Sequence, residues 1–131
     1  MIYFWVVLGS AIGGGLRYFF SGLIAGHFGE IFPFGTLFVN VTGSFVIGFF
    51  AGLTSPDGRF FVSPIARQFV MTGICGGYTT FSSFSLQNLN LLQDEEWLYA
   101  GGNIVLSVGL CLLAAWAGNV AAMAINQMRG V

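Results

Sequence analysis

Apolar residues run along the chain in four long stretches, and short polar segments separate them. The stretches cover approximately residues 2–25, 34–53, 64–92 and 97–126. Each stretch reaches or exceeds the ~20 residues that a helix needs to cross the hydrocarbon core of a membrane. The pattern predicts an all-α membrane protein with four transmembrane helices in a single domain, residues 1–131.

The composition supports this prediction. Charged residues make up 7% of the chain, hydrophobic residues make up 56%, and lysine does not occur. A soluble domain normally carries about 25% charged residues. The chain has too few charges to cover itself against water, so we expect almost all of it to lie within the membrane. Four helices leave little room for both a bundle and an enclosed pathway, and we therefore expect an oligomer that works at or beside its interface.

The arginines favour one orientation only weakly. With four spans, the termini and the middle loop share one side of the membrane, which carries Arg59, Arg67 and Arg129. Arg17 is the only other arginine, and it lies inside the first span. The bias in lysine and arginine sets the topology of a membrane protein. A near-balance of these charges would allow insertion both ways, and a firm bias would select one orientation.

The most unusual segment is residues 73–85, which read G-I-C-G-G-Y-T-T-F-S-S-F-S in the middle of the third stretch. Glycines loosen a helix, and hydroxyl groups need partners where no water is present. We expect the third helix to break at Gly76-Gly77 and to carry Thr80 and Ser83 on one face. A tightly packed seam between helices is an alternative, since small residues favour close approach in membranes. A seam does not explain the two phenylalanines that follow.

Polar side chains also form strips on the second and fourth predicted helices. Asn40 and Ser44 lie one turn apart on the second helix. Asn103, Ser107 and Cys111 recur every four residues on the fourth. Hydrogen bonding between helices would explain each strip alone. Three helices that each offer a polar strip favour a shared pathway lined by neutral hydrogen-bond donors.

The charges that are missing indicate what such a pathway carries. No aspartate or glutamate lies within a span, so the carboxylate relay that serves protons or cations is absent. Arg17 is an intramembrane charge and hence a functional candidate, or else a helix-end residue that snorkels or caps carbonyl groups. The rings of Phe81 and Phe84 have electropositive edges. Amide and hydroxyl donors together with ring edges suit a small, hard anion better than a cation.

The predicted break has a second use. Unwinding a helix in the middle of a membrane frees backbone carbonyl groups, which can coordinate a small cation where the break is buried in protein. We expect these carbonyl groups between Gly76 and Thr79. At a two-fold axis, two carbonyls from each of two chains would supply four ligands.

Three motifs resemble one known family. They are G-G-G-L-R-Y in the first stretch, G-T-L-F-V-N-V-T-G-S-F in the second and G-G-Y-T-T-F-S-S-F-S in the third. With the order, length and number of the spans, they are similar to the Fluc/CrcB fluoride channels over nearly the whole chain. The third motif is highly specific, whereas the glycine–arginine motif alone would be weak.

The resemblance implies an antiparallel, dual-topology dimer in the bacterial inner membrane. Such a dimer has two pores that export cytoplasmic fluoride passively and so confer fluoride resistance. The resemblance also implies a central sodium ion that is held by the backbone carbonyls of Gly76 and Thr79. On the fluoride path it implies Asn40 and Ser83 as donors, Phe81 and Phe84 as the pore phenylalanines, and Arg17 as the counterpart of a first-span arginine.

Two positions depart from the family or vary within it. The hydroxyl between the phenylalanines is often a threonine, and Ser83 keeps the donor while it loses a methyl group. The polar track of the fourth span varies in the family, so Ser107 is assigned to the path by its helical spacing. The roles of Asn103 and Cys111 are left open.

We therefore predict a fluoride-selective passive channel that has fluoride and membrane lipid as partners and sodium as a structural ion. The chain pairs with itself or with a paralogue, and we expect no nucleic-acid partner. A coupled exporter of small ions and a membrane assembly subunit that transports nothing are the alternatives. An enzyme is not expected, because Ser82 and Ser83 have no histidine or carboxylate near them in the sequence to act as a base.

Overall fold

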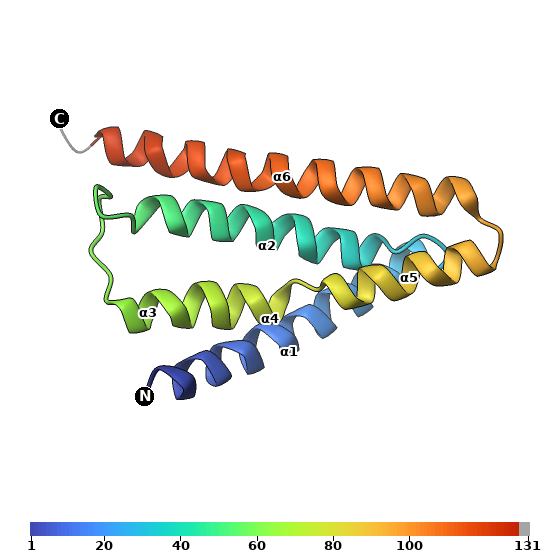
Figure 1. The fold of residues 1–131 in the computed structure, drawn as a ribbon, viewed down its shortest axis with the longest axis horizontal. Helices are drawn as coiled ribbons and strands as arrows, with labels where there is room; N and C mark the ends of the chain where they lie inside the picture. The colour runs from blue at the N-terminus through green and yellow to red at the C-terminus, as the bar shows by residue number, and fades with distance from the viewer. Residues whose placement is uncertain (129–131) are drawn as a thin grey trace.

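The computed structural model describes residues 1–128, and the elements in that range are all helical. Arg129, whose charge enters the prediction of orientation, lies outside the described residues. The elements are α1 (Ile2–Phe28), α2 (Phe34–Leu53), α3 (Pro64–Gln68), the π-helical η1 (Phe69–Cys75), α4 (Gly76–Tyr78), α5 (Phe81–Gln93) and α6 (Trp97–Gln127). Figure 1 shows that α1 begins and α6 ends at the same end of the molecule.

Within the described range, α1, α2 and α6 are the helices long and apolar enough to cross a membrane. These three span candidates correspond to three of the predicted spans. The bounds of α2 agree with the prediction, whereas α1 continues to Phe28 and α6 to Gln127. The remaining stretch runs beside α2 as α3, η1, α4 and α5, joined end to end (Figure 1). Its crossing of the membrane as a fourth span stays a prediction.

The third stretch is broken at Thr79 and Thr80, and the prediction of a break at Gly76-Gly77 is wrong. Gly76 has helical dihedral angles (φ −64°, ψ −37°), whereas Thr79 (φ −85°, ψ 160°) and Thr80 (φ −151°, ψ 120°) are extended. Threonine is branched at Cβ and fits an extended backbone well. The Thr80 hydroxyl also accepts a hydrogen bond from the Ser83 N–H at 3.1 Å and so begins α5.

Gly77 stays helical because it is a packing residue. A Cβ atom at this position would lie 2.6 Å from the Ser10 carbonyl oxygen of α1. A Cβ at Gly9 would lie 2.5 Å from the Phe69 carbonyl oxygen, and a Cβ at Gly13 would also meet the backbone of this segment. These glycines form a seam in which the two backbones touch, as small residues allow in membranes. The four-residue spacing of Gly9 and Gly13 therefore serves close packing.

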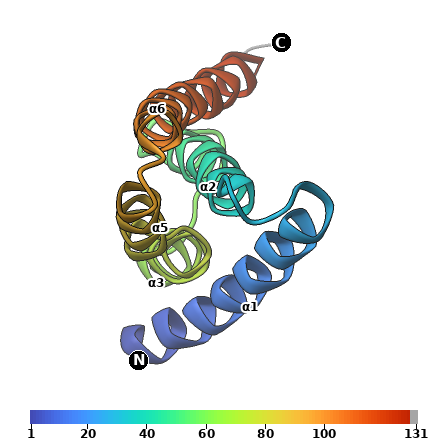
Figure 2. The ribbon, with the colours of Figure 1, turned by 90° about the vertical axis from the view of Figure 1, so that its right-hand side faces the viewer.

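A second seam joins α2 to α6. Gly48 lies directly against the backbone of Ala115, and Gly118 lies against the backbone of Phe45. The Gly22 and Gly26 pair is similarly spaced, but a Cβ at either position would meet no other part of the chain within 4 Å. The first seam joins α1 to η1 and α4, and the second joins α2 to α6. Figure 2 shows α1 and α6 on opposite sides of α2.

The surface of the chain is apolar over most of its length. Large hydrophobic side chains are exposed along α1 and α6, among them Phe4, Phe19, Leu112 and Trp116. Few large side chains are fully buried, and Val39 and Asn103 are the largest of these among the described residues. An apolar exterior around a small interior is what a lipid-embedded chain requires, because lipid replaces the core as the apolar environment.

Candidate functional site

The break in the third stretch is held by Asn40 of α2. Its side-chain Oδ1 accepts a hydrogen bond from the Thr80 N–H at 2.7 Å, and its Nδ2 donates to the Thr80 carbonyl at 3.1 Å. One amide side chain thereby replaces both bonds that the Thr80 peptide groups would make in a continuous helix. Asn40 is therefore a clamp on the break, a role that the sequence did not indicate.

The clamp leaves backbone groups free at both edges of the break. Because the Thr80 N–H binds Asn40, the Gly76 carbonyl lacks its usual helical donor. In residues 1–128 no hydrogen bond to the carbonyl oxygens of Gly76 or Thr79 is found. The N–H groups of Phe81 and Ser82, at the start of α5, also have no acceptor in this part of the chain. The break thus presents a partly negative end of α4 beside a partly positive end of α5.

Arg17 binds one carbonyl group of the α4 end. Its Nε donates a hydrogen bond to the Gly77 carbonyl at 3.2 Å, from α1 across 60 residues of sequence. Arg17 therefore caps a backbone carbonyl group, which is one of the two roles that the sequence left open for it. Without that bond the Gly77 carbonyl would lack a donor as well, since the break removes its helical partner at Phe81.

A pocket of about 320 Å³ lies along one side of the break. α2 contributes Asn40 and Ser44, and the third stretch contributes residues on both sides of the break. The predicted site residues in its lining are Asn40, Gly76, Thr79, Phe81, Phe84 and Ser107, and Cys111 lies there as well. The structure therefore brings residues from all three predicted polar strips together.

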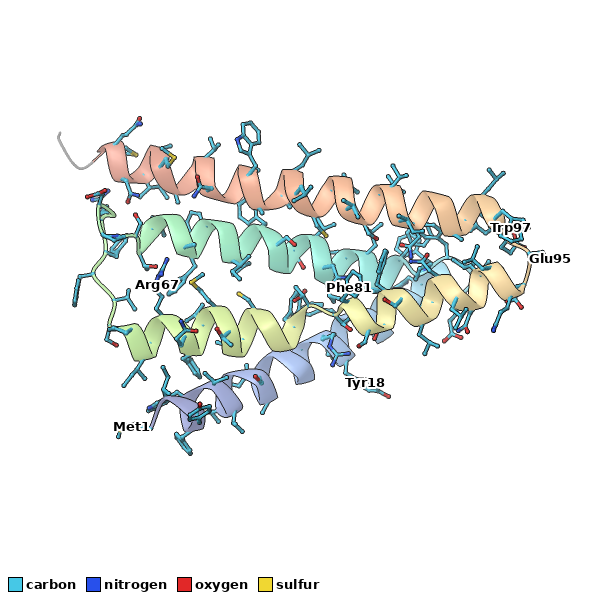
Figure 3. The ribbon with its side chains drawn as sticks, in the orientation of Figure 1. Met1, Tyr18, Arg67, Phe81, Glu95 and Trp97 are labelled. Carbon is cyan, nitrogen blue, oxygen red and sulfur yellow. The ribbon has the colours of Figure 1, made fainter. Side chains whose placement is uncertain are left out.

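The two phenylalanines lie side by side in the lining of this pocket. The ring centroids of Phe81 and Phe84 lie 5.5 Å apart at an interplanar angle of 49°. The Phe81 side chain is 79% exposed within the single chain, and Figure 3 shows it beside the break, at the start of α5. The pocket is therefore open on this side, where only lipid or another protein chain can complete it.

Ser83 is not brought into that pocket. It lines a second one of about 540 Å³, together with Arg17, Gln87 and Thr80. Thr80 lines both pockets, so they meet at the break. The described structure does not test the role of Ser83 on a fluoride path, which stays a prediction.

The polar strip on α6 divides between a buried network and the first pocket. Asn103 is 1% exposed, and its Nδ2 donates to Asn88 Oδ1 of α5 at 3.0 Å. The Ser107 hydroxyl donates to Asn103 Oδ1 at 3.1 Å and reaches the pocket wall. Asn88 was missed by the sequence analysis, although an amide near the end of an apolar stretch was a signal for such a partner. This network holds the Ser107 hydroxyl at the pocket wall through its hydrogen bond to Asn103.

Side chains offer no metal site at this position. Within the described residues there is no group of three or more His, Cys, Asp or Glu side chains that could hold a metal ion. The free carbonyls of Gly76 and Thr79 are instead the oxygen donors near the break. Backbone carbonyls of this kind suit a small, hard cation such as sodium.

These features define a multi-pass membrane protein with an interrupted helix beside a pocket of amide, hydroxyl and aromatic groups. Residues 4–119 match the family described as CrcB-like protein, Camphor Resistance (CrcB). The chain belongs to this CrcB-like family, as the resemblance of its motifs predicted.

Curated relatives agree over nearly the full length. The chain is 58% identical to a protein of Methylocella silvestris over 99% of both chains. It is 57% identical to one of Opitutus terrae over 98% of both chains, and 60% identical to one of Paramagnetospirillum magneticum over 97% of this chain and 99% of the relative. All three relatives are named fluoride-specific ion channel FluC. Relatives that are ion channels also confirm the expectation that the chain is not an enzyme.

Proposed function

We propose that this chain is a fluoride-selective passive channel of the bacterial plasma membrane. The observation that carries this function is the pocket beside the break. Its lining combines amide and hydroxyl groups with two phenylalanine rings and contains no charged side chain. The names of the relatives supply the identity of the anion.

The break supplies the electrostatics that an anion needs. The free N–H groups of Phe81 and Ser82 lie at the N-terminal end of α5, where the helix dipole favours negative charge. Asn40 Nδ2 carries two hydrogens, and only one of them is used on the Thr80 carbonyl. The electropositive edges of Phe81 and Phe84 complete the wall. These donors replace water around fluoride while the absence of a full positive charge keeps binding weak enough for release.

A second copy of the chain completes the pathway in this proposal. Phe81 is largely exposed beside polar groups of Asn40, Ser44 and Ser107. Polar groups at this depth cannot be left to lipid at low cost. Two chains in antiparallel orientation would cover each other's open pocket and form two pores, and a nearly balanced arginine distribution is compatible with insertion in both orientations.

A sodium ion fits the carbonyl edge of the break. The carbonyls of Gly76 and Thr79 have no hydrogen bonds in the described residues, and a Cβ on Gly76 would meet only one atom within 4 Å, the Met71 carbonyl oxygen at 3.8 Å. The side of Gly76 is thus open for a partner chain. Four carbonyls from two chains would supply the oxygen ligands and fasten the dimer.

Passive conduction is sufficient for export. Hydrogen fluoride crosses membranes in its neutral form and dissociates inside the cell, and the membrane potential then drives the anion outward. No acidic side chain lies in the predicted spans to couple this flow to protons. The same route explains how the chain would confer resistance to fluoride.

Fluoride efflux from liposomes that contain the purified protein tests the proposal, with chloride as the control anion. We expect rapid fluoride efflux that needs only its own gradient and a compensating cation ionophore. Efflux that depends on a second coupled ion would support a coupled exporter instead. If neither anion moves, the chain is not a channel and a role as an assembly subunit becomes the better description.

A further inference from the structure

A second concentration of polar groups lies far from the break, where the loop after α2 leads into α3. A cavity of about 650 Å³ opens there, and its lining includes Thr54, Ser55, Arg59, Phe60, Phe61 and Arg67. We call this cavity the basic recess. The channel pocket shares none of these residues, and the proposed function does not use them.

Neither arginine of the recess has an acidic partner in the part of the chain that the structure describes. Arg67 Nε donates to the Thr54 hydroxyl at 3.1 Å and its Nη2 donates to the Ala51 carbonyl at 3.4 Å. These bonds hold the guanidinium between α3 and the end of α2, as Figure 3 shows, and leave further N–H donors unused. Among residues 1–128 no carboxylate lies within ion-pair distance of Arg67 or of Arg59.

Arg59 is positioned by its backbone, and its side chain is free. The Arg59 N–H donates to Asn126 Oδ1 of α6 at 2.8 Å, and no hydrogen bond of its guanidinium is found in the described range. Asp57 is close in sequence but lines a different pocket, next to Asn119 and Met123. Two unneutralised guanidinium groups therefore share one cavity, which is a site for an anion with several oxygen atoms.

The rim of the recess indicates where this anion comes from. Phe61 is 97% exposed and Phe60 is 51% exposed, and both line the recess beside the arginines. α2 is long and apolar enough to cross a membrane, and the recess lies where α2 ends, so we expect the recess at the level of the membrane surface. A soluble anion would fill the basic part and leave both rings in water, whereas a phospholipid would cover the rings with its acyl chains.

We propose that the basic recess binds the phosphate headgroup of an anionic phospholipid. Arg59 and Arg67 bind the phosphate oxygens, the Thr54 and Ser55 hydroxyls lie beside it, and Phe60 and Phe61 pack against the acyl chains. Basic pockets between transmembrane helices are known to bind anionic lipid headgroups in this manner. The recess shares no lining residue with the channel pocket, which separates it from the conduction pathway.

Native mass spectrometry of the full-length protein in detergent tests this site, with phosphatidylglycerol and phosphatidylcholine of the same acyl chains as probes. We expect phosphatidylglycerol to bind more tightly, and Arg59→Gln to weaken its binding about fivefold. Arg59→Lys should retain most of the affinity. Gln127→Glu is the matched control, because it changes the net charge equally at an exposed position at the same end of the molecule and outside the recess.

Three results would overturn the proposal. Equal binding of the two lipids would mean that the headgroup charge is not recognised. An equal loss in Arg59→Gln and Gln127→Glu would assign the effect to the general surface charge. Displacement of phosphatidylglycerol by millimolar inorganic phosphate would identify a soluble phosphate site and not a lipid site. Thermal unfolding with each lipid serves as the second measurement, and only phosphatidylglycerol should raise the midpoint of the wild-type protein.

Discussion

Before the break, the third stretch lies backbone to backbone on α1, and after the break α5 contacts little besides one edge of α6. The first part uses glycine at Gly73 and Gly77 to approach α1 closely. The second part exposes Phe81, Leu86 and Leu89. The single apolar stretch therefore has two parts. We call residues 64–78 the anchor, and we call α5 the free part, because its exposed side chains are available to a partner chain or a pathway.

The difference between the two parts explains the position of the break. The anchor must stay helical up to Tyr78, because Gly77 packs on Ser10. The free part can turn only after that contact ends, and Asn40 holds the turn at Thr80. The break then gives the anchor a carbonyl end and the free part an amide end, which are the two polarities that a cation and an anion require.

The largest expected effect is in the anchor. Gly13→Leu places a side chain into the backbone of the third stretch, since even a Cβ at this position would overlap with it. We expect destabilisation of about 3 kcal/mol or more and a loss of folded protein. Thermal unfolding and size-exclusion chromatography in detergent measure it. Gly15→Leu is the control, because no atom lies within 4 Å of a Cβ at Gly15. Equal behaviour of the two variants would contradict the glycine seam.

The second largest effect is expected from a substitution at the break, where the two parts meet. Asn40→Ala removes both hydrogen bonds to Thr80 and leaves its peptide groups unpaired. This should cost about 1–3 kcal/mol in stability and reduce fluoride efflux about tenfold or more. Asn40→Asp keeps the acceptor for the Thr80 N–H but removes the donor that serves both the Thr80 carbonyl and fluoride, and it adds a negative charge, so efflux should fall while the N–H half of the clamp stays. Asn90→Ala, at an exposed amide of α5, serves as the control. Unchanged efflux in Asn40→Ala would refute both roles.

The free part should respond in flux and not in stability. Phe81→Ile removes the ring edge from the pocket, and we expect fluoride efflux to fall about three- to tenfold. The unfolding midpoint of the single chain should change little, because the ring is 79% exposed. Leu89→Ile is the control on the same helix. A large loss of stability with normal efflux per folded molecule would make Phe81 a packing residue.

The smallest effect is expected on the neighbouring helix. Ser107→Ala removes one hydroxyl from the pocket wall and one bond to Asn103. Efflux should fall about two- to fivefold, which corresponds to a single hydrogen bond of about 0.5–1 kcal/mol. Ser85→Ala is the comparison, since its hydroxyl bonds to the Phe81 carbonyl within α5 and lines neither pocket. If both serines gave the same result, Ser107 would have no special place on the path.

Much of this architecture was predictable because hydropathy and motif content are local properties. The bounds of α2 and nearly those of α1 and α6 follow from the length of each apolar run. The gathering of Asn40, Phe81, Phe84 and Ser107 was also expected from their strips and from the family resemblance. The family match over residues 4–119 confirms that resemblance.

The errors came from interactions between distant parts of the chain. Glycine indicated a break at Gly76-Gly77, but the close approach of α1 turned these glycines into packing residues. The pocket that Ser83 lines also depends on how α5 starts at the Thr80 cap, and the role of Ser83 on a fluoride path stays a prediction. The burial of Asn103 against Asn88 likewise depends on how α5 meets α6.

The sequence by itself determined the membrane setting, the helical class, the family and most residues of the pocket, because these depend on composition, spacing and motif. Only the tertiary structure decided where the third stretch breaks, that Asn40 clamps the break and that Arg17 caps Gly77. The physical reason is that a free backbone group must find its partner in space, and here each partner comes from another helix.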